Sequence, residues 1–148
     1  MSLRDAGREH FPQFMTIPTR WMDNDQYGHV NNVVYYSYFD TAVNQFLIER
    51  GVLDIHHGDV VGFVVDSGCS YFSPVSFPDL VHAGIRVAKL GNSSVRYEIA
   101  LFRNDDRLPC AAGHFVHVYV ERGSNRSVPI PAAVRDVLAT IHGAAPAD

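Results

Sequence analysis

The sequence predicts an α+β domain in which one long helix covers a curved antiparallel sheet of about five strands. Two observations lead to this prediction. One stretch, from about residue 32 to residue 50, has apolar residues at helical spacing, and several other stretches have strand-like patterns. The length of 148 residues fits a single domain. We expect its core to span about residues 13–141, between loose ends at 1–10 and 143–148.

The helical stretch has one apolar stripe and recognisable ends. Asn31 or Asn32 is expected to cap its start, because an amide oxygen accepts hydrogen bonds from free backbone N–H groups. Gly51 stands where a helix would end. Val34 and Tyr38 lie off the main stripe, which predicts a helix wrapped by its surroundings. The stripe itself consists of Tyr35, Phe39, Ala42, Val43, Phe46 and Leu47.

The remaining elements are predicted to be strands and one short helix. Their ranges are 13–20, 60–65 with an extension to about 72, 80–90, 94–102 and 111–120. Turn residues after the third and fourth of these ranges predict that the last three strands form a meander. Pro18 assigns the first strand to an edge or a bulge, and a short helix is expected over 131–141. The alternating, hence buried, positions are Val81, Ala83, Ile85, Val87, Val95, Tyr97, Ile99, Leu101, Val116, Val118 and Val120.

Composition excludes several classes of protein. The formal net charge of −4, from 12 basic and 16 acidic residues, lacks the basic footprint of a nucleic-acid-binding protein. Cys69 and Cys110 form no CxxC pair and have no histidine partner nearby in the sequence, which fits a reducing compartment and argues against a cysteine nucleophile. Residues 1–7 lack the apolar core of a signal peptide, and no apolar run approaches the roughly 20 residues of a membrane helix. We therefore expect a cytoplasmic protein with neither a nucleic-acid nor a membrane partner.

The segment 20–32 carries the most distinctive chemistry. Asp23 and Asp25 lie two residues apart, just before the predicted helix. Only one of the two is expected to serve a given reacting atom, the one that lies close to the helix N-terminus. A helix N-terminus offers unpaired N–H groups that stabilise a carboxylate or a developing oxyanion. A carboxylate beside such a donor is a minimal hydrolytic site, although the same residue types also form ordinary helix caps.

The pattern Arg20-x-x-Asp23-x-Asp25-x-x-Gly28-His29-Val30-Asn31-Asn32-x-x-Tyr35 resembles the N-terminal motif of the 4-hydroxybenzoyl-CoA thioesterase family of hotdog proteins. Weaker similarities follow at Tyr71-x-x-Pro74, at 89–94 and at 126–131, so the resemblance covers roughly residues 13–141. It implies a hotdog fold and hydrolysis of an acyl-CoA thioester to a carboxylic acid and free CoA. No metal or redox cofactor is then expected, because CoA enters as part of the substrate.

The resemblance also implies roles for individual residues. The predicted catalytic set is Asp25, Gly28, His29 and Asn32. Asp25 would be the catalytic carboxylate, acting as base or nucleophile, and the backbone N–H of Asn32 would polarise the thioester carbonyl. Gly28 would let the loop fold tightly over the helix end, with His29 in support. Asp23 would hold the loop, either by pairing with Arg20 or by capping N–H groups.

For CoA itself, and for the assembly, the resemblance implies less specific contacts. Some relatives carry several basic residues in the turn before the fourth strand, where this chain reads Gly91-Asn92-Ser93-Ser94. We predict CoA contacts at Lys89, Ser94 and Arg126. The resemblance further implies a homodimer whose sheets join edge to edge, or a homotetramer, with each active site at the subunit boundary.

Alternative functions remain open. An acyl-carrier-protein thioesterase, a hydratase of the same fold and a non-catalytic acyl-CoA-binding module are the rival interpretations, although the segment from Asp25 to Asn32 argues against a hydratase. His114-x-x-His117 would place its two rings on opposite faces of a strand, which is poor metal-ligand geometry. Asp66 is a further candidate for the wall of the acyl pocket.

Overall fold

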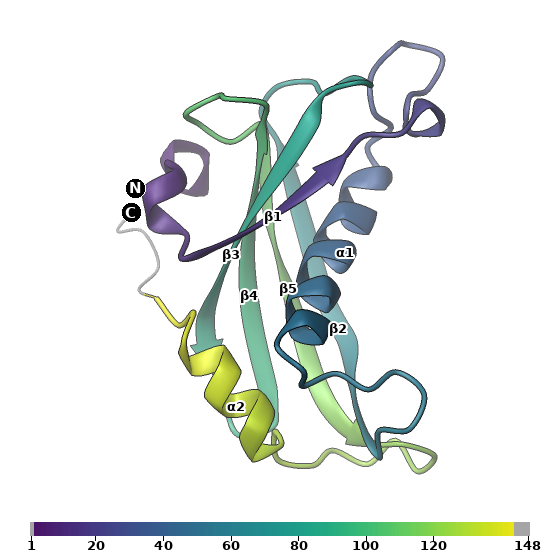
Figure 1. Ribbon diagram of the computed structural model, residues 1–148, viewed down its shortest axis with the longest axis vertical. Coiled ribbons are helices and arrows are strands. Elements are labelled where there is room, and N and C mark those ends of the chain that lie inside the picture. Colours follow the sequence, from purple (N-terminus) through teal and green to yellow (C-terminus); the bar gives the residue numbers. More distant parts are fainter. Residues whose placement is uncertain (1, 144–148) are drawn as a thin grey trace.

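Five antiparallel strands form one sheet in the computed structural model of the chain, which describes residues 2–143 (Figure 1). The strands are β1 (Gln13–Pro18), β2 (Val60–Tyr71), β3 (Leu80–Leu90), β4 (Ser94–Arg103) and β5 (Ala111–Glu121), and their order across the sheet is β1-β3-β4-β5-β2. The helices are α1 (Val34–Glu49) and α2 (Ala132–Ala139), with short 3₁₀ turns η1 (Leu3–Asp5), η2 (Arg8–His10) and η3 (Trp21–Asp23). The predicted α+β fold of one long helix on a five-stranded sheet is confirmed.

Helix α1 lies against the concave face of the sheet (Figure 1). Its whole predicted stripe is buried, and so is Tyr38, which the pattern placed off the stripe. The opposite face, with Asp40, Gln45 and Glu49, is exposed, so the helix is covered on one side and not wrapped. Gly51 adopts a positive φ of 73° just beyond the helix, where an L-residue with a side chain would be strained.

The sheet packs against α1 through alternate residues of the central strands. The predicted inward positions on β3 and β4 are all fully buried. On β5 the predicted parity is wrong, because Phe115 and Tyr119 face the helix while Val116 and Val118 are half-buried on the other face. The larger aromatic side chains fill the space beneath α1, as the edge-to-face contact of Phe115 with Phe39 at 5.7 Å shows.

The two edges of the sheet differ in exposure. Strand β1 is one edge, as predicted from Pro18, and it ends at Pro18, two residues before the predicted end. Strand β2 is the other edge, 12 residues long, with a bulge between Val64 and Asp66. Its apolar run is largely exposed, with Val64 at 47% and Val65 at 58%. A long, exposed, apolar edge is a surface suited to pairing with another strand.

The N-terminal segment is not loose, contrary to the prediction. It carries η1 and η2 across the convex face of the sheet, where Ala6 and Phe11 pack on Phe102 and its small neighbours. Arg86 lies fully buried beneath this segment, paired with Glu98 at 2.8 Å and donating to the His10 carbonyl at 3.2 Å. The apolar outer face of β4 needs a cover, and this segment supplies it. Of the C-terminal tail predicted to be loose, residues 144–148 lie outside the described part.

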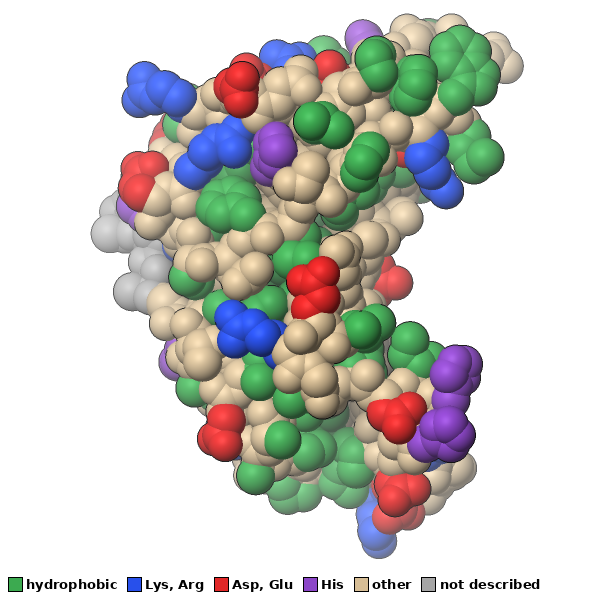
Figure 2. Space-filling view, in the orientation of Figure 1, with side chains coloured by type: hydrophobic (Ala, Val, Ile, Leu, Met, Phe, Trp, Pro, Cys, Tyr) green, Lys and Arg blue, Asp and Glu red, His purple; other side chains and the backbone are tan. Residues whose placement is uncertain are grey.

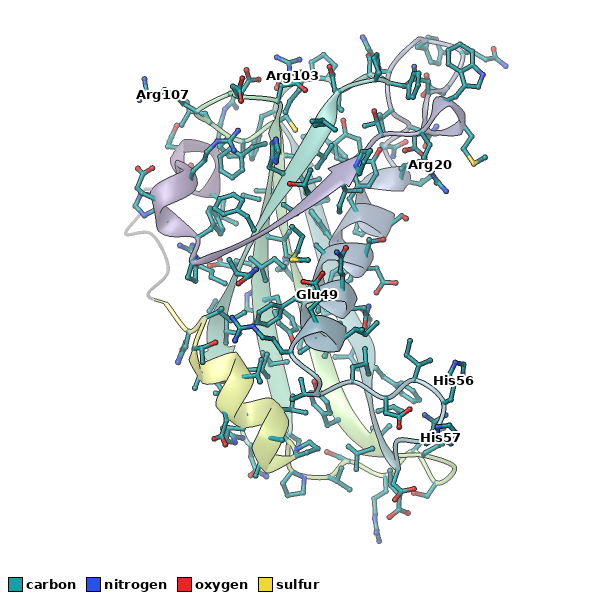
Figure 3. The ribbon with its side chains drawn as sticks, viewed as in Figure 1. Arg20, Glu49, His56, His57, Arg103 and Arg107 are labelled. Atoms are coloured by element: carbon teal, nitrogen blue, oxygen red, sulfur yellow. The ribbon has the colours of Figure 1, made fainter. Side chains whose placement is uncertain are left out.

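A hollow runs along the exposed side of α1 (Figure 2). It lies between the end of the molecule that carries Arg20 and the end that carries His56 and His57 (Figure 3). The loop before α1 overhangs it at one end, and the segment after α1 at the other. None of the helices in residues 2–143 is long and apolar enough to cross a membrane.

Candidate active site

The loop from Asn24 to Asn32 closes on itself before α1 begins. The backbone N–H of Asp25 donates to the His29 carbonyl at 2.9 Å, and the N–H of Gly28 donates back to the Asp25 carbonyl at 3.0 Å. Gly28 adopts a φ of +83°, so this turn needs a residue without a side chain, as predicted. The N–H of Val30 then donates to the Val75 carbonyl at 2.7 Å, which attaches the loop to the segment after β2.

Asp23 is buried and holds the base of this loop. One carboxylate oxygen accepts from the Arg20 backbone N–H at 2.9 Å and from the Tyr38 hydroxyl at 2.8 Å, and the other pairs with the Arg20 guanidinium. Burial raises the pKa of Asp23, but these hydrogen bonds and the Arg20 charge outweigh it, so the net pKa is lowered. The predicted pairing of Asp23 with Arg20 is confirmed. Both carboxylate oxygens of Asp23 accept hydrogen bonds that hold the loop in place.

Asp25 is half-buried and turned toward solvent-accessible space. Its Oδ1 accepts from the Tyr27 backbone N–H at 2.8 Å, and its Oδ2 accepts from the Asn31 side-chain amide at 3.3 Å. The carboxylate is therefore oriented without being enclosed. It lies at a recess of about 450 Å³ lined by Asp25, Tyr27, His29, Val30, Asn32, Tyr35, Tyr71, Phe72, Ser73 and Pro74.

The start of α1 lies in the same recess and presents a donor. The Asn31 side chain caps the helix, since its Oδ1 accepts from the Val33 backbone N–H at 3.1 Å. The backbone N–H of Asn32 donates to no group within residues 2–143 and is exposed. A free N–H at a helix N-terminus carries part of the positive end of the helix dipole. Asp25 and Asn32 therefore line one recess, the first with a carboxylate and the second beside the start of α1.

Asn31 and Tyr71 fix the geometry of this pair, and neither was in the predicted catalytic set. Asn31 connects the helix end to Asp25 through its two amide atoms. The Tyr71 hydroxyl donates to the Asn32 carbonyl at 2.9 Å, and its ring packs edge-to-face on Tyr35 at 4.9 Å. Burial raises the pKa of Tyr71 to about 12, so the hydroxyl keeps its proton at neutral pH. The capping pattern points to Asn31 in the sequence, whereas Tyr71 is 39 residues from its partner and gives no local signal.

The structure separates the two predicted residue groups from each other. Asp25, Gly28, His29 and Asn32 share the loop and the helix start, and three of them line the recess. The predicted CoA contacts lie at the opposite end of the sheet, at the end of β3, the start of β4 and the loop after β5. Arg126 there pairs with Glu121 at 3.4 Å. Within one protomer, Lys89, Ser94 and Arg126 are therefore remote from Asp25.

Other reactive side chains of the described region lie outside this recess. His114 and His117 face opposite sides of β5, as predicted, and His114 contacts Asp66 on the convex face at 3.1 Å. That position removes Asp66 from the wall of the Asp25 recess. Burial raises the pKa of Cys69 to about 11 and that of Cys110 to about 12, so both remain thiols at neutral pH.

A model of the thioesterase-like superfamily matches residues 19–138, which include the loop, α1 and the whole of β2 to β5. The chain belongs to the thioesterase-like superfamily. Such a family assignment supports thioester hydrolysis as the reaction type.

Solved structures similar to this thioesterase-like protein extend the match to the whole fold. The PA5185 protein of Pseudomonas aeruginosa strain PAO1 is 59% identical, with a TM-score of 0.92 over 95% of this chain and 98% of that one. A candidate thioesterase of the same species, the PA2801 protein, is 32% identical, with a TM-score of 0.81 over 86% and 98%. A 1,4-dihydroxy-2-naphthoyl-CoA thioesterase from Synechocystis, only 14% identical, shares the fold with a TM-score of 0.79 over 85% and 94%.

Proposed function

We propose that this protein is an acyl-CoA thioesterase of the 4-hydroxybenzoyl-CoA thioesterase type, which hydrolyses an acyl-CoA to a carboxylic acid and free CoA. The observation that carries the proposal is that Asp25 and Asn32 line one recess, and that the Asn32 backbone N–H has no acceptor among residues 2–143. A thioester needs both a nucleophile at its carbonyl carbon and a donor for the charge that develops on its oxygen. Family membership supports the same reaction class.

Two routes use these groups in the same positions. In one, Asp25 takes a proton from water, and the resulting hydroxide attacks the carbonyl carbon. The C–S bond then breaks, and the CoA thiolate takes the proton back from Asp25. In the other, Asp25 attacks directly, CoA leaves as a thiol after protonation, and water hydrolyses the mixed anhydride. In both routes the Asn32 N–H donates to the carbonyl oxygen as it becomes negative. Both consume one water and release one acid and one thiol.

The direct test is a hydrolysis screen over short, long, branched and aromatic acyl-CoAs, with the released thiol measured by a colour reagent. We expect thiol release above the uncatalysed rate for at least one acyl class. The same acyl groups carried on an acyl-carrier protein are tested in parallel. If only the acyl-carrier-protein thioesters are hydrolysed, the protein is an acyl-carrier-protein thioesterase. If thioesters bind and none is hydrolysed, the assignment is wrong and the protein is a binding module.

We also propose that the active unit is a homodimer in which the two β2 edges pair antiparallel about a two-fold axis. The exposed apolar edge of β2 and the hollow along α1 support this arrangement (Figure 2). Antiparallel pairing brings the start of β2 in one protomer beside Tyr71 of the other, and Tyr71 lines the Asp25 recess. Contacts of Lys89, Ser94 or Arg126 with CoA would then depend on the partner. A homotetramer would require a further contact between dimers.

Charges on the β2 edge are expected to separate the dimer. Val64→Lys combined with Val65→Lys brings like charges of both protomers together at the paired edge, while both positions are about half exposed in the single protomer. Light scattering after size-exclusion chromatography should change from two copies to one. Asp136→Lys on α2, an equally exposed charge change, should leave the mass at two copies. A wild-type protein that elutes as a monomer at the highest soluble concentration would contradict the proposal.

A further inference from the structure

A second recess on the same protomer adjoins the Asp25 recess. Phe72 and Ser73 line both, so the two share a wall directly after β2. The second recess also has a volume of about 450 Å³. Its other lining residues come from the N-terminal segment and from the β4–β5 hairpin: Arg4, Asp5, Asp106, Arg107, Leu108 and Pro109.

Two arginines on this second recess are available to a ligand. Within residues 2–143, Arg4 and Arg107 form no ion pair and donate no hydrogen bond. Asp106, which also lines the recess, is already paired with Arg103 at 3.0 Å. Asp5 accepts only from the Ser2 hydroxyl, at 3.2 Å. Because the protein as a whole carries a net charge of −4, an anionic ligand needs such a local basic group.

The packing of the N-terminal segment sets the position of Arg4. The guanidinium of Arg4 lies over the Phe72 ring at 5.4 Å, so it stands directly at the shared wall. Arg8 anchors the same segment to the hairpin by donating to the carbonyls of Asn104 at 2.7 Å and Asp106 at 3.0 Å. Arg107 extends from the tip of that hairpin, above the N-terminal segment (Figure 3). The two guanidinium groups therefore belong to one structured groove.

We propose that this groove, formed by Arg4, Phe72 and Arg107, binds the phosphate groups of the CoA moiety while the thioester lies at Asp25. The inference rests on the proposed function and deepens it, because it assigns the phosphate contacts within one protomer. The pantetheine arm would run along the shared wall at Phe72 and Ser73. Guanidinium groups suit this role because they donate two parallel hydrogen bonds to a phosphate. Lys89 and Arg126 of the same protomer then have no part in phosphate binding.

The groove is tested by comparing KM for a substrate that carries the phosphates, acyl-CoA, with KM for one that lacks them, acyl-pantetheine. Arg4→Gln and Arg107→Gln are each expected to raise KM for the best acyl-CoA about 5-fold, and the double variant about 20-fold, as exposed charge contacts do. The kcat at saturating acyl-CoA should stay at the wild-type value. With the corresponding acyl-pantetheine, which lacks the nucleotide and its phosphates, variant and wild type should have the same KM.

A matched control separates this role from a general loss of charge. Arg50 is also exposed and also stacks on a phenylalanine, Phe46, at 5.0 Å, but it lies at the far end of α1. Arg50→Gln should leave both KM values unchanged. The proposal is overturned if the Arg4 and Arg107 variants leave KM for acyl-CoA unchanged, or raise it equally for acyl-pantetheine. A shift seen in a Lys89→Gln, Arg126→Gln double variant, and absent from the groove variants, overturns it as well.

Direct binding keeps this inference distinct from the proposed activity. Calorimetry with free CoA and with pantetheine needs no turnover, and it can use the Asp25→Asn background. If the groove binds phosphate, CoA binds the parent protein at least about 10-fold more tightly than pantetheine, and the groove double variant removes most of that difference. Equal affinities for CoA and pantetheine in the parent protein refute the groove, whatever the hydrolysis screen finds.

Discussion

Replacing Asp25 by asparagine is expected to lower kcat for thioester hydrolysis by about 10²- to 10⁴-fold, the usual contribution of a positioned base or nucleophile. The amide keeps one oxygen that accepts from the Tyr27 backbone N–H, so the loop should keep its turn. It has no negative charge with which to attack carbon or to take a proton. Stopped-flow or steady-state thiol release with the best acyl-CoA measures the change, and circular dichroism checks the fold.

Asp66→Asn is the matched control for this variant. It removes an exposed carboxylate on the convex face, outside the recess, and kcat should stay within about 2-fold of wild type, as expected for a surface substitution away from the reacting atoms. A wild-type rate in the Asp25 variant would refute its catalytic role. Single-turnover hydrolysis in ¹⁸O-labelled water then separates the two routes. Label entering Asp25 indicates attack by the carboxylate itself, and label confined to the product acid indicates a water nucleophile.

Replacing Asp23 by alanine is expected to lower the free energy of unfolding by about 2–4 kcal/mol at neutral pH, because buried polar partners lose their acceptor. The Tyr38 hydroxyl is buried and would have no partner, and the Arg20 backbone and side chain would lose three further contacts. Urea denaturation measures the change. If the unfolding free energy falls by less than that of Tyr38→Phe, which removes only one of these bonds, the assigned role of Asp23 is wrong.

The contribution of Asp23 should also depend on pH in a defined direction. Its pKa is lowered in the folded protein relative to the ordinary value of 3.8, so the folded state favours the carboxylate. The stabilisation is therefore fully present above about pH 4 and decreases as the pH falls toward the folded-state pKa. The difference in unfolding free energy between wild type and Asp23→Ala should shrink in that acidic range. A difference that is constant from pH 7 to pH 3 would contradict this linkage.

Local sequence predicts some parts of the site, and the different roles of the two aspartates show where local sequence stops being sufficient. Arg20 is a local partner for Asp23, and the family motif marks Asp25, but a spacing of two residues would place both side chains on the same face of an extended chain. The burial of Asp23 depends on Tyr38, which lies 15 residues away on α1. Tyr71 holds the Asn32 carbonyl from the end of β2, and no local pattern records that contact.

By itself, the sequence determined the main helices and strands and the turn before α1. Helical and strand periodicity are local properties, and so are the positive φ at Gly28 and the Asn31 cap. Only the tertiary structure decided which face of β5 is buried, which strand is the exposed edge, and where the N-terminal segment lies. These outcomes depend on contacts between distant residues, such as Phe115 with Phe39 and Phe11 with Phe102. They also separated Asp25 from Lys89 and Arg126 and brought Arg4 and Arg107 onto the recess that adjoins it.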